Sequence, residues 1–260
     1  FANLLEAEIE NLNKSADMFL EINMGGTAIG TGLNAAPGFP KVCAKKLSEL
    51  TGMEFKASED LIAATPDTTD LVQYSSAMKR LAIKLSKICN DLRLMACGLH
   101  EINLPPMAPG SSIMPGKVNP VIPEVTNQTC FKVIGNDTTV MLAAEAGQLQ
   151  LNVMEPIIMQ CLVEDITWLG EAFDTLREKC IDGITLNREH NAEMVKHSIG
   201  IVTALNPYIG YKNSTKIAKK ALETGGSVYN IVLEEGVLTK EQLDKILSPE
   251  HMLDSEEKVK

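Results

Sequence analysis

The residues best suited to chemistry are concentrated in one stretch rich in proline and glycine, PPMAPGSSIMPGKVNPVIP, at 105–123. Ser111 and Ser112 offer hydroxyl groups, and Lys117 offers a positive charge. Asn119 supplies a side-chain amide just before a predicted helix, whose free N–H groups favour anions. These residue types predict a site for an anionic substrate.

The length of this stretch also favours a function. Helices in a bundle are usually joined by shorter connections, and long ordered loops on rigid scaffolds often carry binding or catalytic residues. Gly110 offers a hinge at the start of the serine pair. The alternative is that the serines and Asn119 only cap the following helix. The residues by themselves leave both interpretations open.

The flanking segments have helical periodicity. One apolar stripe comprises Leu5, Ile9, Leu12, Ala16 and Phe19 and predicts a helix ending near Gly25 and Gly26. A second pattern repeats every seven residues, in two seams made of Leu71, Met78, Leu85 and Leu92 and of Tyr74, Leu81, Ile88 and Met95. Such seams are typical of long helices packed side by side. The predicted helix that carries these seams begins near the cap-forming residues at 67–70 and ends near Gly98.

Two more helices are predicted, from about Pro123 to Gln148 and from about Pro156 to Cys180. The buried face predicted for the latter comprises Ile158, Leu162, Ile166, Leu169, Phe173 and Leu176. Strand-like alternation is almost absent, so the predicted fold class is all-α, a long-helix bundle followed by a small helical domain. Four glycines lie close together at Gly25, Gly26, Gly30 and Gly32. No strand precedes them, as one would in a phosphate-binding loop, so they indicate close packing or a bend.

The predicted domains are a central bundle at 1–182, which contains the loop 105–123, and a small helical domain at 183–260. After Gly183 the pattern changes to short helices separated by turns, and Thr239 with Gln242 fits a capping box. The chain begins at Phe1 within an amphipathic pattern and without Met, which predicts that the natural protein extends further toward its amino terminus.

Composition excludes several classes of partner. A net charge of −10 argues against nucleic acid and anionic membranes, and charges interrupt every apolar run before it could span a bilayer. We therefore expect a cytoplasmic protein with a small-molecule substrate. The six cysteines include no C-x-x-C pair, so we expect reduced thiols and no metal site.

The segment GSSIMPGKVNP at 110–120 resembles the signature of the aspartase/fumarase superfamily. Three further segments support the resemblance: MGGTAIGTGLN at 24–34, KLSKICNDLRLM at 84–95 and GIVTALNPYIGY at 200–211. The resemblance implies a homotetramer whose long helices merge in a central bundle, with each active site assembled from three subunits. It also implies a reaction that eliminates a group across a carbon–carbon bond to give fumarate.

The same resemblance implies the roles of individual residues. Ser111 matches the serine that removes the β-proton, while Lys117 and Asn119, with Ser112, match residues that bind the substrate. Glu124 matches a glutamate that pairs with a histidine from elsewhere in the assembly. The flexible part of the loop would comprise Gly110, Ile113, Met114, Pro115 and Gly116.

Two departures from the family pattern affect these expectations. The other two signature segments, including that histidine, would lie before Phe1, so we expect the chain alone to be inactive and the residues that bind the substrate amino group to lie outside it. A Pro-Arg-Gly insertion common in the family is missing between Gly98 and Glu101, so no arginine is carried over from it. The resemblance implies no organic cofactor; some relatives are activated by divalent cations.

The stretch at 119–156 is similar to aspartases nearly residue for residue, while fumarases differ over 121–128 and 143–155. We therefore expect deamination of L-aspartate to fumarate and ammonia. The alternatives are a fumarase, which would hydrate fumarate to L-malate with the same base, and a catalytically dead helical module that only oligomerises.

Overall fold

A computed structural model of the chain describes residues 1–108, 110 and 112–253. In these residues the secondary structure is helical apart from four strands of two residues each, and the predicted all-α class is confirmed. The chain forms two compact units. The first comprises residues 1–99 and 104–185, and the second comprises residues 100–103 and the chain from residue 186. Four residues that precede the signature loop therefore fold with the second unit.

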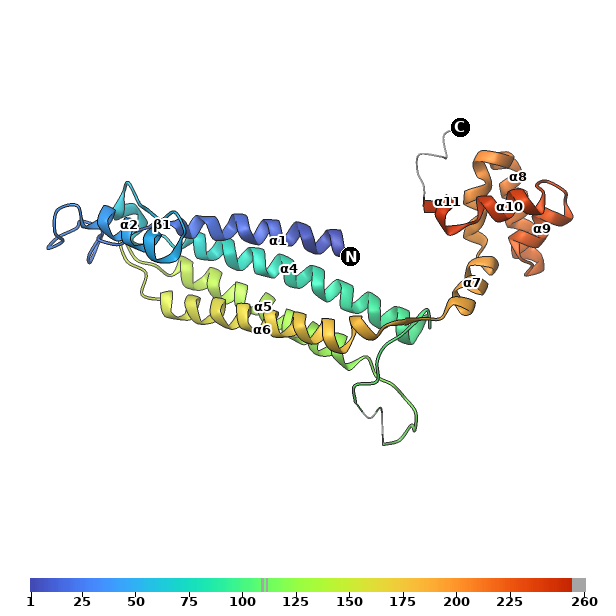
Figure 1. The fold of residues 1–260 in the computed structure, drawn as a ribbon, viewed down its shortest axis with the longest axis horizontal. Coiled ribbons are helices and arrows are strands. Elements are labelled where there is room, and N and C mark those ends of the chain that lie inside the picture. The colour runs from blue at the N-terminus through green and yellow to red at the C-terminus, as the bar shows by residue number, and fades with distance from the viewer. Residues whose placement is uncertain (109, 111, 254–260) are drawn as a thin grey trace. The chain divides into compact units, whose positions relative to one another are not determined.

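Four long helices lie side by side in the first unit (Figure 1). They are α1 (Ala2–Ala16), α4 (Thr69–Arg93), α5 (Val121–Glu145) and α6 (Glu155–Lys179). Helix α4 packs against α1 and α5, and α5 packs against α6. The seven-residue seams of α4 form the core as predicted, with buried side chains at Met78, Leu81, Leu85, Ile88 and Leu92.

The ends of α4 follow the cap signals in the sequence. Asp67 Oδ1 accepts hydrogen bonds from the backbone N–H of Thr69 at 2.9 Å and from its hydroxyl at 2.7 Å. At the other end α4 continues as a five-residue π-helix, η2 (Leu94–Gly98). The chain then reverses at His100, whose φ of 57° lies in the left-handed region. This turn spans the place where the family insertion is missing.

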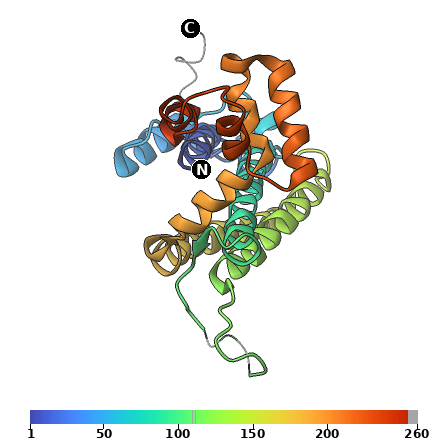
Figure 2. The same cartoon turned by 90° about the vertical axis from the view of Figure 1, so that its right-hand side faces the viewer.

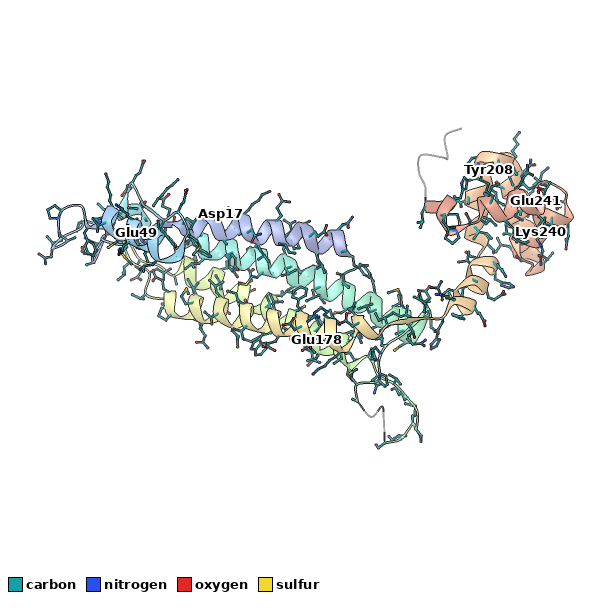
Figure 3. The ribbon with its side chains drawn as sticks, viewed as in Figure 1. Asp17, Glu49, Glu178, Tyr208, Lys240 and Glu241 are labelled. Atoms are coloured by element: carbon teal, nitrogen blue, oxygen red, sulfur yellow. The ribbon has the colours of Figure 1, made fainter. Side chains whose placement is uncertain are left out.

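Helix α1 differs from its prediction. It ends at Ala16 and continues only as a 3₁₀ turn, η1 (Asp17–Leu20), which begins at the Asp17 labelled in Figure 3. Ile9 is 60% exposed, whereas Glu8 is fully buried. Arg80 Nε lies 3.0 Å from Glu8 Oε2, and Lys84 also pairs with this carboxylate. The contact between α1 and α4 is therefore partly ionic, which an apolar stripe cannot reveal.

The buried face of α6 also differs at two positions. Ile158, Leu162, Leu169 and Leu176 are buried as predicted, but Ile166 is 50% exposed and Phe173 is only half-buried. Asp165 is buried instead. The 3.6-residue period explains the correction, because positions 158, 162, 165, 169, 172 and 176 share one face, whereas position 166 lies about 80° and position 173 about 60° from the centre of that face.

Small elements cover one end of the bundle (Figure 1). Strand β1 (Glu21–Ile22) pairs in parallel with β2 (Lys56–Ala57); helix α2 (Phe39–Thr51) lies between the two strands in sequence, and α3 (Leu61–Ala64) follows β2. Gly30 packs against the start of α3, where a Cβ would lie 2.3 Å from Leu61 O. Gly30 therefore serves close packing, as predicted, whereas the atom nearest to a Cβ on Gly32 is 3.6 Å away.

The second unit is built from short helices. They are α7 (Arg188–His197), η4 (Ile199–Ile201), α8 (Val202–Thr224), α9 (Val228–Glu234), α10 (Lys240–Ile246) and α11 (Pro249–Leu253). Their shared core includes Leu205, Ile217, Val232 and Leu243. The predicted capping box at Thr239 is confirmed, immediately before the Lys240 and Glu241 labelled in Figure 3. Before this unit, η3 (Ile181–Gly183) leads into β4 (Thr185–Leu186), which pairs with β3 (Ile102–Asn103).

A cluster of polar side chains joins α5 and α6, and two of them, Asn136 and Asp165, are buried. Asn136 Nδ2 donates to Asp165 Oδ1 at 2.6 Å and to Glu164 Oε2 at 2.9 Å, and Lys132 pairs with Glu164 at 2.9 Å. Asp165 is 1% exposed, and its Oδ2 has no hydrogen-bond partner among the described residues. Burial, helped by the neighbouring Glu164, raises the pKa of Asp165 from the ordinary 3.8 to about 6.

This pKa predicts a pH-dependent stability. Because the folded-state pKa is raised, the stabilising contribution is fully present below pH 3.8 and is lost as the pH rises to about 6. We expect Asp165→Asn to increase the free energy of unfolding at neutral pH by about 1–3 kcal/mol, and to flatten its fall across that window. Urea denaturation at several pH values measures both effects. Glu171→Gln, at an exposed site on the same helix, is the control, and equal pH slopes for wild type and Asp165→Asn would contradict the assignment.

Candidate active site

The described residues of the signature loop between Leu104 and Pro120 are irregular, and they project away from the bundle (Figures 1 and 2). It connects β3 with α5. Proline at 120 precedes α5, and no side chain caps that helix. The Asn119 amide does not serve as the cap suggested by the alternative interpretation, because it donates to Gly110 O at 2.6 Å.

The residues expected to act on the substrate are spread along this loop. Ser111, the expected base, lies outside the described residues. Ser112 and Lys117 are exposed, and Asn119 is half-buried. The loop therefore displays a hydroxyl and an ammonium group to solvent close to the first turn of α5, where free N–H groups favour an anion.

Gly110 and Lys117 lie together at the neck of the loop. A Cβ on Gly110 would lie 1.3 Å from Lys117 O, so no other residue fits without moving the backbone. The tip between them includes Ile113, which is 86% exposed, and Gly116, whose φ is 82°. Lys117 N donates to Met114 O at 3.3 Å and closes the turn through Pro115. Gly110 therefore lies at a tight crossing of the backbone.

Glu124 lies in the first turn of α5 and is about two-fifths exposed. Its charged neighbour in the described chain is Arg93, whose Nη2 is 3.7 Å from Glu124 Oε1. Arg93 closes α4, and its Nε is buried without a hydrogen-bond partner among the described residues. The sequence pattern did not single out Arg93, and its one local signal was its place directly after the buried seam residue Leu92.

This arrangement can bind a carboxylate and stabilise negative charge that develops beside it. Lysine and amide donors are suited to that work, and the helix start adds a fixed positive potential. In the described part of the chain, no three His, Cys, Asp or Glu side chains gather as metal ligands would. None of the described helices has both the length and the apolarity to cross a membrane.

Comparison with solved structures defines the class of protein. The fold matches a fumarate lyase:delta crystallin from Brucella melitensis bound to cobalt, with a TM-score of 0.91 and 45% identity over 98% of this chain and 56% of that one. It also matches a recombinant class II fumarase from Schistosoma mansoni, with a TM-score of 0.86 and 33% identity over 96% of this chain and 56% of that one. A long-helix bundle with this loop is therefore the fold of a fumarate lyase.

Sequence comparison gives the family. Residues 1–135 match the family described as Lyase, and residues 201–254 match the one described as Fumarase C C-terminus. The chain belongs to this lyase family, and the resemblance to the aspartase/fumarase superfamily is confirmed. An aspartate ammonia-lyase from Pseudomonas aeruginosa is 55% identical over 97% of this chain and 54% of its own length. The chain spans about half the length of the curated relatives it matches.

The crossing at the loop neck can be tested with a single methyl group. We expect Gly110→Ala to force the neck apart, because its Cβ would overlap Lys117 O, and to speed proteolytic cleavage within 104–120 at least several-fold. The control is Gly135→Ala in α5, where nothing lies within 4 Å of the added Cβ. That helical substitution should leave loop cleavage unchanged and stabilise the protein by about 0.5–1 kcal/mol. Equal cleavage rates for Gly110→Ala and wild type would show that the neck is open.

Proposed function

We propose that the complete protein containing this chain is an aspartate ammonia-lyase, which converts L-aspartate to fumarate and ammonia. The observation that carries the proposal is the identity of 54–55% with aspartate ammonia-lyases across 97% of the chain. The class II fumarase shares the fold at 33% identity. The signature loop, with its serines, lysine and asparagine, supports the same reaction type.

In the proposed mechanism Ser111, as an alkoxide, takes the proton from the β-carbon of aspartate. The electron pair left behind is delocalised into the neighbouring carboxylate as an enediolate, and it then forms the C=C bond while the C–N bond breaks and ammonia leaves. Lys117, Asn119 and Ser112 would hold the carboxylate and stabilise its added negative charge, which supplies the largest catalytic term in reactions of this kind. Asn119 would exchange its bond to Gly110 O for one to the substrate.

Glu124 would orient a histidine from elsewhere in the assembly, with Arg93 holding the carboxylate from the other side. No organic cofactor is needed, because the substrate carboxylate itself accepts the electron pair. The net charge of −10 supports a small-molecule substrate rather than nucleic acid. The proposed location is the cytoplasm.

The proposal includes a homotetramer assembled through the helical bundle. In the described chain, α5 and α6 expose large apolar side chains along their lengths, among them Phe131, Met141, Leu142, Met159, Val163, Ile166 and Trp168. Their exposed fractions lie between 44% and 60%. Apolar side chains gathered along two adjacent helices support association with further helices, since leaving them in water is unfavourable.

The assignment of the base predicts the effect of removing one hydroxyl. With the product of the complete gene, we expect fumarate to form from L-aspartate, measured by its ultraviolet absorbance. Ser111→Ala should lower kcat by about 1000-fold, because general-base catalysis contributes roughly 100- to 10,000-fold. Ser112→Ala, the neighbouring hydroxyl, should lower it by about 10-fold or less. An equal loss of kcat in both variants would show that Ser111 is not the base.

The same assay separates the alternatives. Turnover of L-malate without turnover of aspartate would identify a fumarase. A complete protein that is inert on both substrates would favour a helical module that only oligomerises.

The proposed assembly predicts which apolar side chains matter for association. Placing a charge on the exposed face, as Phe131→Glu or Val163→Glu, should shift the complete protein from tetramer toward smaller species in analytical ultracentrifugation. Leu222→Glu in the second unit, at a site that is 68% exposed, is the matched control and should leave the mass unchanged. If the complete protein remains a tetramer with either bundle substitution, the interface does not include this face of α5 and α6.

A further inference from the structure

Asn187 stands at the N-cap position of α7 but does not cap that helix. Asparagine is favoured at this position because its side-chain oxygen can accept a bond from the first turn. Here the side chain turns to the segment 100–103 instead. Its Nδ2 donates to His100 O at 2.6 Å, and its Oδ1 accepts a bond from Asn103 Nδ2 at 2.6 Å.

Three further hydrogen bonds complete this clamp. Asn187 N donates to Glu101 O at 3.0 Å, and Asn191 Nδ2, one turn into α7, donates to the same carbonyl at 3.1 Å. Asn187 Nδ2 also lies 3.2 Å from Asn103 Oδ1. Consecutive carbonyl groups of the segment are thus held by residues from the start of one helix.

The clamped segment contains a strained residue. The φ of 57° at His100 lies in the left-handed region, which residues other than glycine adopt uncommonly, although Asn, Asp and His do so more often than the rest. Such a conformation persists only when surrounding contacts hold it. The bond from Asn187 Nδ2 to His100 O provides one of these contacts.

The segment 100–103 is also the root of the signature loop. The chain leaves β3 at Asn103 and enters the loop at Leu104, seven residues before Ser111. Any change in the direction of the segment is passed to the loop through the covalent chain. The neck at Gly110 and the start of α5 hold the other end.

We infer that Asn187 is a positioning residue for the signature loop: by clamping its root, Asn187 sets where the loop presents the residues that act on the substrate. This inference rests on the proposed function and extends it. Asn187 does not contact the loop beyond Asn103 in the described bonds and need not touch the reacting atoms. Its influence on rate follows from geometry, since a displacement of about 1 Å at a reacting group can cost about 100-fold in rate.

Two substitutions separate the bonds of the clamp. Asn187→Ala removes every hydrogen bond made by the Asn187 side chain. Asn187→Asp keeps the acceptor for Asn103 Nδ2 but replaces the donor facing His100 O with a carboxylate oxygen, which repels it. Aspartate is as favourable as asparagine at an N-cap, so α7 is not weakened by that change. Asn213→Ala is the control, because Asn213 is exposed in α8 and its Nδ2 bonds only the nearby Ile209 O among the recorded contacts.

The test uses the complete protein and two independent readouts. The first is kcat and KM for L-aspartate. The second is hydrogen exchange of the backbone amides in 100–118, measured by mass spectrometry, which does not depend on activity. For Asn187→Ala and Asn187→Asp we expect kcat to fall about 10-fold or more with KM changed less, and exchange to rise in both the root and the loop. Asn213→Ala should change neither.

The outcomes distinguish this inference from the proposed function. Normal kcat in both Asn187 variants, or faster exchange confined to 100–103, would overturn the positioning role even if aspartate is the substrate. A wild-type protein that is inert on aspartate would overturn the proposed function. In that case, faster loop exchange in the Asn187 variants and not in Asn213→Ala would still support the clamp as the element that orders the loop. Asn187→Asp provides the result if Asn187→Ala does not fold.

Discussion

The bundle depends on polar groups that are buried between its helices and must find their partners on the next helix. Glu8 of α1 meets Arg80 and Lys84 of α4. Between α4 and α5, Asn127 Nδ2 donates to Ser86 Oγ at 2.8 Å. Between α5 and α6, Asn136 meets Asp165. An apolar seam tolerates a slip of one turn, whereas a buried polar group that loses its partner is costly. These pairs therefore fix the register of all four helices.

The register of α4 and α5 determines which side chains meet at the end of the bundle that carries the loop. With α4 and α5 held in place, Arg93 at the end of one helix lies beside Glu124 in the first turn of the other. The same register fixes the distance that the chain from Gly98 to Val121 must span. That distance is covered by a π turn, a left-handed residue at His100, a short strand and a loop pinched at Gly110. Part of the unusual backbone therefore lies where the chemistry is proposed, and a larger group of positive-φ residues lies at 25–38.

The outer side of α5 and α6 follows from the same arrangement. Each helix uses one face for the polar and apolar contacts of the bundle, which leaves the opposite apolar residues, such as Phe131 and Val163, in solvent. Helices that are apolar on more than one face are typical of elements buried on both sides. Apolar surface on α5 and α6 thus has two roles. One face packs within the bundle of the single chain, and the other supports the proposed association.

The sequence by itself determined the all-α class, the positions of α4, α5 and α6 to within about three residues, the capping box at Thr239 and the loop that carries the signature. These are local properties, set by periodicity, capping and backbone preference, and a chain expresses them wherever it folds. Only the tertiary structure decided that Glu8 and Asp165 face inward while Ile9 and Ile166 face water. It also decided that Arg93 joins Glu124 and that Asn187 clamps the root of the loop. Those contacts join residues from 29 to 87 positions apart on the chain, or depend on which face of a helix its neighbours cover, and no pattern within one segment encodes them.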